Sequence, residues 1–240
     1  MSKSSGFFVT GTDTEVGKTL VSGALILKLH DQGKSVIGFK PVVAGTYQNK
    51  EGKTLNEDLE TLRIASKLAP GQLDLCPYVL DMPIAPHLAA AVKGIQLEMS
   101  VIMKALGNLQ SKYDSLVVEG AGGFLIPLND QEDLGLLAQK INLPVIMVVG
   151  MKLGCISHAL LTQEAIKSRG LTIAGWVANT LSSEMALLPE NIQSLQSKIQ
   201  APFLGCIPAL PNSLQKADNS PYSIKALDFA AQHIQIPNDE

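Results

Sequence analysis

The sequence predicts an α/β fold in which helices cover both faces of a mostly parallel sheet. Apolar, strand-like runs alternate with segments of helical periodicity along the chain, which is the pattern of repeated strand–helix units. The strand-like runs are apolar at successive positions, so both faces of each strand are expected to be buried. Polar motifs directly follow these runs, at the edge where open α/β sheets bind ligands.

Six apolar runs have the length of buried strands, namely residues 7–9, 35–39, 115–118, 144–149, 173–178 and 203–207. Helices are expected between them, because apolar residues recur there at intervals of three and four. Four helical faces are marked by Val21, Ala24, Leu25 and Leu29; by Ile102, Ala105, Leu106 and Leu109; by Leu134, Leu137, Ala138 and Ile141; and by Ile224, Leu227 and Ala231.

Residues 45–86 fit this pattern least well. They are polar at first and rich in proline later, and we interpret them as loops with one short helix near residues 58–68. No repeat, low-complexity stretch or Ser/Pro-rich linker divides the chain. Residues 1–240 are therefore expected to form a single domain.

The composition argues against several classes of protein. Hydrophobic residues make up 46% of the chain and charged residues 17%, which indicates a buried globular core. The net charge of -3 gives no electrostatic reason to expect a nucleic-acid partner. Residues 1–6 do not resemble a secretion signal, and the apolar runs are too short to cross a membrane. Cys76, Cys155 and Cys206 lack metal or disulfide spacing, so reduced thiols in a cytoplasm are expected.

A glycine-rich segment, Gly11-Thr-Asp-Thr-Glu-Val-Gly17-Lys18-Thr19, lies between the first strand and the first helix. Backbone N–H groups of such a loop bind phosphates, and the expected ATP contacts are Thr14, Glu15, Val16, Gly17, Lys18, Thr19 and Leu20. Lys18 is expected to reach the β and γ phosphates, and the Thr19 hydroxyl to bind Mg²⁺. The loop has five residues between its glycines instead of the standard four, so a chance Gly-Lys-Thr is the alternative. Its place between a strand and a helix favours a P-loop.

Five motifs together resemble the dethiobiotin synthetase family in order and spacing. They are Val9-Thr-Gly-Thr-Asp-Thr-Glu-Val-Gly-Lys-Thr19, Gly38-Phe-Lys-Pro-Val42, Val118-Glu-Gly-Ala-Gly-Gly123, Gly150-Met-Lys-Leu-Gly-Cys-Ile156 and Ala174-Gly-Trp-Val-Ala-Asn179. The similarity covers roughly residues 5–210, and the tail after Pro211 is much less informative. The resemblance implies an enzyme that converts 7,8-diaminononanoate, CO₂ and MgATP into dethiobiotin, ADP and phosphate. The implied intermediates are a carbamate and a carbamic-phosphoric anhydride.

The resemblance also implies roles for residues at the strand ends. Lys40 is expected to be catalytic together with Lys18, because a fixed cation stabilises the carbamate and the transferring phosphoryl group. Asp58 and Glu119 are expected to bind Mg²⁺ with Thr19 and to contact ATP. The alternative for Lys40 is a solvated surface lysine, and the alternative for Asp58 is a helix cap or a first-turn charge. Further ATP contacts are expected at Gly120, Ala121, Gly122, Asn179, Thr180, Pro208, Ala209 and Leu210. Asn179 and residues 208–210 are expected on the adenine side, and a turn residue is the alternative for Asn179.

For the diamine, the family pattern implies contacts from Lys40, Ala44, Thr46, Gly122, Gly154, Cys155 and Ser157. It also implies a homodimer, in which the start of the helix near residue 154 serves the neighbouring subunit's site. Two positions depart from the pattern. Ala44 stands where the family usually has a Ser or Thr hydroxyl, and Ser157 stands where it more often has Asn. The Thr46 hydroxyl is an alternative donor for the missing contact at position 44.

Two other functions compete with this hypothesis. A switch or partitioning ATPase of the P-loop superfamily would act by binding a partner, but it usually has a second lysine early in the loop. This chain has Thr12-Asp13-Thr14 there. The synthetase half of a glutamine-dependent amide synthase would need a further amidotransferase domain, for which 240 residues leave no room.

Overall fold

The computed structural model describes residues 5–69 and 75–237. Six strands form a parallel sheet in the order β10-β9-β8-β1-β7-β2. The strands are β1 (Ser5–Gly11), β2 (Val36–Phe39), β7 (Ser115–Glu119), β8 (Val145–Met151), β9 (Ile173–Thr180) and β10 (Phe203–Ile207). All six expected strands are present, and the prediction of an α/β fold with a parallel sheet is confirmed.

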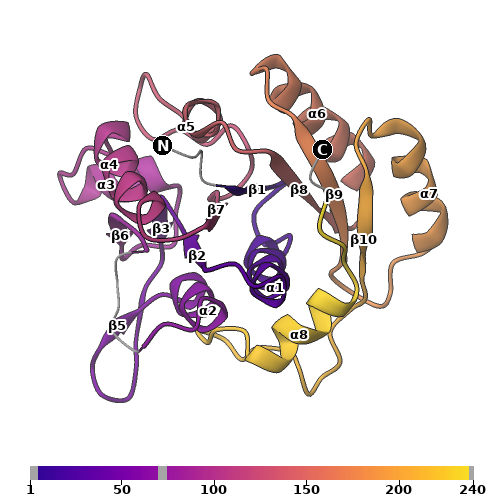
Figure 1. Ribbon diagram of the computed structural model, residues 1–240, viewed down its shortest axis with the longest axis horizontal. Coiled ribbons are helices and arrows are strands. Elements are labelled where there is room, and N and C mark those ends of the chain that lie inside the picture. Colours follow the sequence, from indigo (N-terminus) through magenta and orange to yellow (C-terminus); the bar gives the residue numbers. More distant parts are fainter. Residues whose placement is uncertain (1–4, 70–74, 238–240) are drawn as a thin grey trace.

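Helices cover both faces of this sheet (Figure 1). On one face lie α1 (Lys18–Asp31), α2 (Glu57–Ala65) and α8 (Ile224–Gln232), which pack against one another. On the other lie α4 (Met99–Gln110), α5 (Leu134–Ile141) and α6 (Cys155–Ser168), with α7 (Leu188–Lys198) packed against α6. The four helical faces expected from the sequence therefore belong to α1, α4, α5 and α8.

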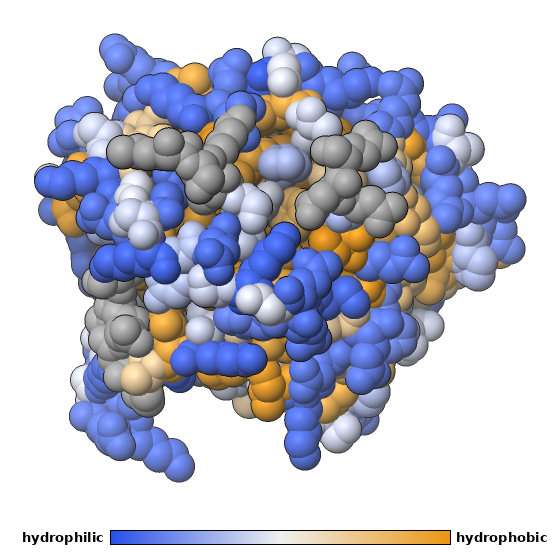
Figure 2. Space-filling model, in the orientation of Figure 1, coloured by the Kyte–Doolittle hydropathy of each residue, from blue (hydrophilic) through white to orange (hydrophobic). Residues whose placement is uncertain are grey.

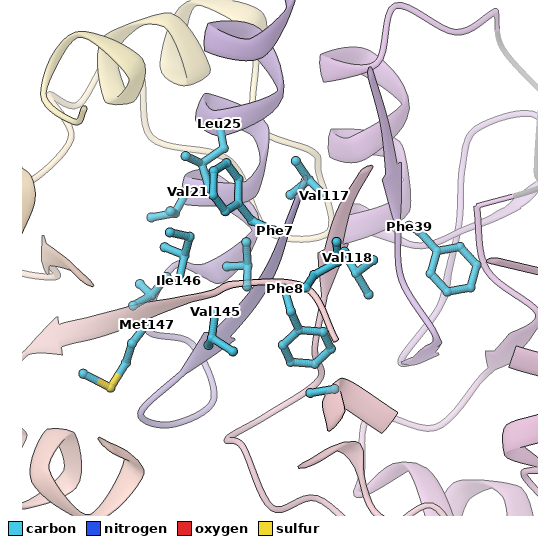
Figure 3. Packing of buried hydrophobic residues seen from close by; sticks show 14 of the residues in the cluster. Phe7, Phe8, Val21, Leu25, Phe39, Val117, Val118, Val145, Ile146 and Met147 are labelled. Carbon is cyan, nitrogen blue, oxygen red and sulfur yellow. The ribbon is translucent and has the colours of Figure 1, made fainter. Parts of the chain in front are cut away.

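The core between the layers follows from the alternation of side chains along each strand. Phe7 of β1 points toward Val21 and Leu25 of α1, whereas Phe8 points to the opposite face (Figure 3). Both phenylalanines are buried, and the cluster that they join includes residues from β1 to Ile234 beyond α8. Hydrophilic residues cover most of the face drawn in Figure 2.

Residues 45–86 contain more structure than expected. Besides α2, which corresponds to the helix expected near 58–68, they include β4 (Tyr47–Gln48) paired with β5 (Thr54–Leu55), and β6 (Tyr78–Leu80). β6 pairs with β3 (Val42–Ala44), and α3 (Pro86–Val92) follows. The interpretation as loops with one helix is therefore wrong for these strands. Pairing of such short segments depends on partners distant in the sequence, which local patterns do not reveal.

Two parts of the sequence interpretation lie partly outside the described residues, namely the start of the chain at 1–4 and residues 70–74. Within the described part, no helix is long and apolar enough to cross a membrane. All three cysteines have free thiols.

Candidate functional site

The glycine-rich segment 11–19, which we call the phosphate loop, joins the carboxyl end of β1 to the first turn of α1. Gly17 caps α1 with φ of 89°, a left-handed conformation that favours glycine. A Cβ atom on Gly17 would also lie 2.1 Å from the Asn179 Nδ2 atom. Asn179, near the end of β9, uses this amide to donate a hydrogen bond of 2.9 Å to the Val16 carbonyl. Only glycine fits at position 17, and Asn179 fixes the loop against the sheet.

Lys18 is held in the loop by the backbone, and none of the described carboxylates forms an ion pair with it. Its Nζ donates to the Asp13 carbonyl oxygen at 2.9 Å, and the residue is buried. Burial, and then the nearby charge of Lys40, lowers the pKa of Lys18 to about 8. A buried ammonium group beside backbone N–H groups is suited to bind an anion such as a phosphate.

Lys40 lies at the centre of a buried cluster with Asp58 and Glu119. Its Nζ is 2.8 Å from Asp58 Oδ2 and 2.5 Å from Glu119 Oε1. The sheet register explains this contact, because Phe39 of β2 is paired with Val118 of β7 and the next residues are Lys40 and Glu119. Lys40 is only 3% exposed, so it is not a solvated surface lysine.

Asp58 reaches the cluster from the first turn of α2. The cap of this helix is Asn56, whose Oδ1 accepts hydrogen bonds from the backbone N–H groups of Asp58 and Leu59. Asp58 is therefore not the cap, and its carboxylate is available to pair with Lys40. The Asn56 amide donates to the Gly45 carbonyl at 2.7 Å, which ties the start of α2 to the loop after β3.

The opposite charges in this cluster shift the pKa values of Lys40 and Asp58 toward their charged forms. Burial lowers the pKa of Lys40, but Asp58 and Glu119 more than offset this, and the net shift is upward. Burial raises the pKa of Asp58, but Lys40 and the Thr19 hydroxyl outweigh it, and the net shift is downward. Lys40 is therefore protonated and Asp58 is ionised at neutral pH.

The two carboxylates and Thr19 have the chemistry of a Mg²⁺ site. Thr19 Oγ1 lies 2.7 Å from both Asp58 Oδ1 and Glu119 Oε1, but its single hydrogen can be donated to only one of them at a time. The Glu119 Oε2 atom is buried and has no hydrogen-bond partner in the described part of the chain. An unpaired carboxylate oxygen in the interior is costly, and Mg²⁺ accepts such hard oxygen ligands. The described residues contain no group of three or more His, Cys, Asp or Glu suited to a metal, so other ligands would have to complete the shell.

The residues expected on the adenine side lie together at the other end of the sheet edge. Ile207 of β10 is paired with Asn179 of β9, so the segment 208–210 continues beside Asn179. Thr180 Oγ1 is 3.6 Å from the Cys206 sulfur. One Asn179 amide hydrogen is already donated to the Val16 carbonyl. The Oδ1 atom and the second amide hydrogen of Asn179 can therefore bond to a nucleotide base.

The expected diamine contacts fall into two groups. Ala44 and Thr46 lie at the end of β3 and just beyond it, where the Thr46 backbone N–H donates to the Asp81 carbonyl. Gly122 has φ of 63° in the loop after β7.

The second group of expected diamine contacts is at the start of α6. Gly154 is the cap of this helix, Cys155 is buried and Ser157 is exposed. Among the described residues, no hydrogen bond or ion pair joins this second group to Lys40, whose partners are Asp58, Glu119 and Gly120.

Sequence reasoning missed two contacts around the site. Lys152 Nζ is 2.8 Å from Asp13 Oδ2, so the segment before α6 is tied to the phosphate loop. A lysine and an aspartate inside two recognised motifs were the available signal. Tyr222, in the uninformative tail, lies close enough that burial and then Asp58 raise its pKa to about 12. No sequence motif marks Tyr222.

Comparison with known proteins places the chain in a family. Residues 5–217 match the model of the AAA domain family AAA_26. The chain is 48% identical over 208 residues to the "ATP-dependent dethiobiotin synthetase BioD" of Aromatoleum aromaticum, covering 87% of this chain and 92% of the relative. The chain belongs to the dethiobiotin synthetase family. The protein of the same name from Ralstonia nicotianae is also 48% identical, over 85% of this chain and 89% of its own length.

Solved structures show a wider likeness in fold. The septum site-determining protein MinD of Pyrococcus horikoshii superposes with a TM-score of 0.54 at 17% identity, covering 95% of each chain. This similarity concerns the fold alone. The matched family region ends at residue 217, so it includes Lys40, Asp58, Glu119 and Asn179 but stops before α8.

Proposed function

We propose that the protein carboxylates 7,8-diaminononanoate with CO₂ and closes the product to the cyclic urea of dethiobiotin, at the expense of ATP. The single observation that carries the proposal is Lys40, held between Asp58 and Glu119 beside the phosphate loop. Family membership supports the choice of substrate, since the two relatives at 48% identity are named as ATP-dependent dethiobiotin synthetases.

The reaction needs ATP because a carbamate oxygen is a poor leaving group. One amine of the substrate adds to CO₂ and loses a proton, which gives the carbamate. A carbamate oxygen then takes the γ-phosphoryl group of ATP, and ADP leaves. The second amine attacks the carbamoyl carbon, phosphate departs with the oxygen, and the five-membered urea ring closes with loss of a proton.

Charged side chains of the protein would stabilise the negative charge on the phosphates and the carbamate in these steps. Lys18 would bind the β and γ phosphates, and Lys40 would stabilise the carbamate and the phosphoryl oxygens as charge develops. The backbone around Gly122, with its positive φ, allows a close approach of substrate. Holding the amines, CO₂ and the phosphoryl group together supplies much of the acceleration.

Mg²⁺ would be held by Thr19, Asp58 and Glu119, and when bound it would neutralise charge on the β and γ phosphates. The unpaired Glu119 Oε2 supports this assignment. Adenine would lie against Asn179, Thr180 and the segment 208–210, and the glycine-rich residues 120–122 would contact the phosphates.

The protein is also proposed to be a homodimer of the cytoplasm, in which the start of α6 completes the partner's diamine site. Leu153, directly before the helix cap, is 100% exposed, and Leu161 on α6 is 66% exposed. Exposed apolar side chains of this size, at the start of α6 and along it, favour burial against a second protein surface. The free thiols are in keeping with a reducing compartment.

Isotope incorporation tests the proposed reaction. Incubation with ¹³C-bicarbonate, MgATP and the diamine is expected to give dethiobiotin that is one mass unit heavier, as measured by mass spectrometry, and omission of Mg²⁺ or ATP should prevent it. If ATP were hydrolysed with no labelled product, a switch ATPase of similar fold would be the better description.

A further inference from the structure

The chain beyond residues 208–210 runs back to α2, the helix that carries Asp58. We call residues 211–223 the C-terminal strap; it leads from the segment 208–210 to α8. Within the strap, Lys216 Nζ is 2.6 Å from Glu57 Oε2, the first residue of α2. The same ammonium group lies 5.5 Å from the centre of the Tyr222 ring. The strap therefore contacts the residue directly before Asp58.

A second contact fixes the same turn of α2. The Tyr222 backbone N–H donates to Thr61 Oγ1 at 3.0 Å, and Thr61 Oγ1 donates to the Glu57 carbonyl at 2.8 Å. Thr61 is 1% exposed, so its hydroxyl group makes these bonds at the edge of the interior. The strap thus holds both the side chain and the backbone of Glu57.

The far end of the strap is anchored on the helix of the phosphate loop. α8 packs against α1 so closely that a Cβ atom on Gly23 would lie 2.6 Å from Leu227 Cδ2. Lys28 of α1 donates to the Ala231 carbonyl at 3.3 Å. Figure 1 shows α8 crossing beside α1, with its first turn near α2. The strap therefore spans from α1 to the first turn of α2.

We infer that Lys216 is a positioning residue for Asp58, acting through Glu57. The first turn of α2 carries three acidic residues, Glu57, Asp58 and Glu60. Lys216 forms an ion pair with the Glu57 carboxylate. This pair holds the first turn of α2 in place, so that the Asp58 carboxylate keeps the orientation in which it contacts Lys40 and Thr19. The inference rests on the proposed function only in taking Asp58 as a metal ligand.

Positioning and simple electrostatics predict opposite results. Removing a cation near Asp58 makes the site more negative, which by itself favours a divalent cation. Lys216 and Glu57 are about one-third exposed, so this effect is screened and small. Loss of a group that orients a metal ligand, in contrast, typically weakens metal binding by about 10–100-fold. Positioning should therefore outweigh the charge effect.

The test measures binding of Mn²⁺, a paramagnetic substitute for Mg²⁺, in the presence of ADP by electron paramagnetic resonance. Lys216→Met is expected to weaken Mn²⁺ binding by about tenfold, and Lys216→Arg to restore it. Lys225→Met, at an exposed lysine of α8, is the matched control for loss of one charge and should bind as the unmodified protein does. Mn²⁺ binding equal to or tighter than normal in Lys216→Met would overturn the inference. A loss of similar size in Lys225→Met would do the same.

A second pair of variants tests the buried contact. Thr61→Val keeps the shape but removes both hydrogen bonds, whereas Thr61→Ser keeps the hydroxyl. Weaker Mn²⁺ binding in Thr61→Val than in Thr61→Ser is expected, and equal binding in the two would contradict the role of the strap. Neither measurement involves the diamine or CO₂, so failure of the proposed carboxylation would appear separately, as a missing product.

Discussion

Lys40 Nζ and Glu119 Oε1 lie 2.5 Å apart, although 79 residues separate them in the sequence. Their strands, β2 and β7, are neighbours in the sheet, and parallel pairing brings both carboxyl ends to the same edge. β1, which leads into the phosphate loop, lies on the other side of β7. Lys40 and Glu119 are thereby fixed beside the phosphate loop by rigid backbone, which is the preorganisation that charge stabilisation requires.

Lys40→Ala is expected to lower turnover by about a hundredfold or more, the scale for loss of one charge-stabilising group. It should also destabilise the fold by about 3–5 kcal/mol, because Glu119 would remain buried without its partner. Steady-state kinetics and urea unfolding measure the two effects. Near-normal turnover in this variant would remove Lys40 from the catalytic residues.

The stability deficit of Lys40→Ala should grow as the pH rises. In the unmodified protein the pKa of Asp58 is depressed below 3.8, so its favourable contribution is present above that pH and lost as the pH falls through the lower folded value. Without Lys40, burial raises the pKa of Asp58, so ionisation above pH ~4 would destabilise the variant. Urea unfolding at pH 5 and pH 8 compares the two proteins, and an equal deficit at both pH values would contradict this electrostatic account.

ATP affinity is expected to fall above pH 8. The pKa of Lys18 is lowered to about 8 in the free protein, whereas bound phosphates favour its charged form. Binding should therefore be nearly constant below pH 8 and weaken by up to about tenfold per pH unit above it. Isothermal titration calorimetry measures the profile, and Lys18→Met should flatten it between pH 8 and 10. A profile of the same slope in Lys18→Met would assign the effect to another group.

Gly17→Ala is expected to weaken ATP binding by more than about tenfold, because the new Cβ atom would displace the Asn179 amide in addition to straining the backbone. Gly33→Ala is the matched control. Gly33 has φ of 80°, also left-handed, but a Cβ atom there meets no atom within 4 Å. Both variants carry backbone strain, but only Gly17 lies in the phosphate loop and would bring a Cβ atom against Asn179. Equal ATP affinity in the two variants would show that this contact does not matter.

Ala44→Ser is expected to lower the KM for the diamine by about two- to tenfold and to leave the KM for ATP unchanged, since one neutral hydrogen bond contributes about 0.5–1.5 kcal/mol. If Thr46 already supplies this bond, Ala44→Ser has no effect and Thr46→Val raises the diamine KM by a similar factor. No change in either variant would mean that the loop after Lys40 does not contact the diamine.

Mixing two inactive variants tests the proposed dimer. Equal amounts of Lys40→Ala and a variant disrupted at Gly154 should assort at random, so that half of the dimers are mixed and each mixed dimer has one intact site. Up to about a quarter of the sites should then be active, as expected of a symmetric dimer. A fully active monomer in sedimentation would rule out this arrangement.

The sequence predicted the six strands well because each is apolar on both faces, a pattern that few other structures share. It did not predict α3 or α7. The first is only seven residues long and buries three of them, and the second buries only Leu195, so neither has a clear apolar stripe. The strand order also has no local signature, because β7 is inserted between β1 and β2.

The candidate site was predictable to the extent that its residues lie in motifs. Lys18, Lys40 and Glu119 follow strands, and parallel strands share one edge, so their proximity could be expected. The pairing of Asp58 with Lys40 depends on how α2 is held by Asn56, and the contact of Lys216 with Glu57 depends on the return of the tail across α1. Both are tertiary contacts between segments with no shared pattern.

Release of ADP, measured with and without the diamine and bicarbonate, tests the central claim most directly. The proposed phosphoryl acceptor is the carbamate, which forms only when both are present. ADP formation is therefore expected to require diamine, CO₂ and Mg²⁺ together, with only slow background release when any one is omitted. Rapid ATP turnover in the absence of the diamine would contradict the proposed reaction.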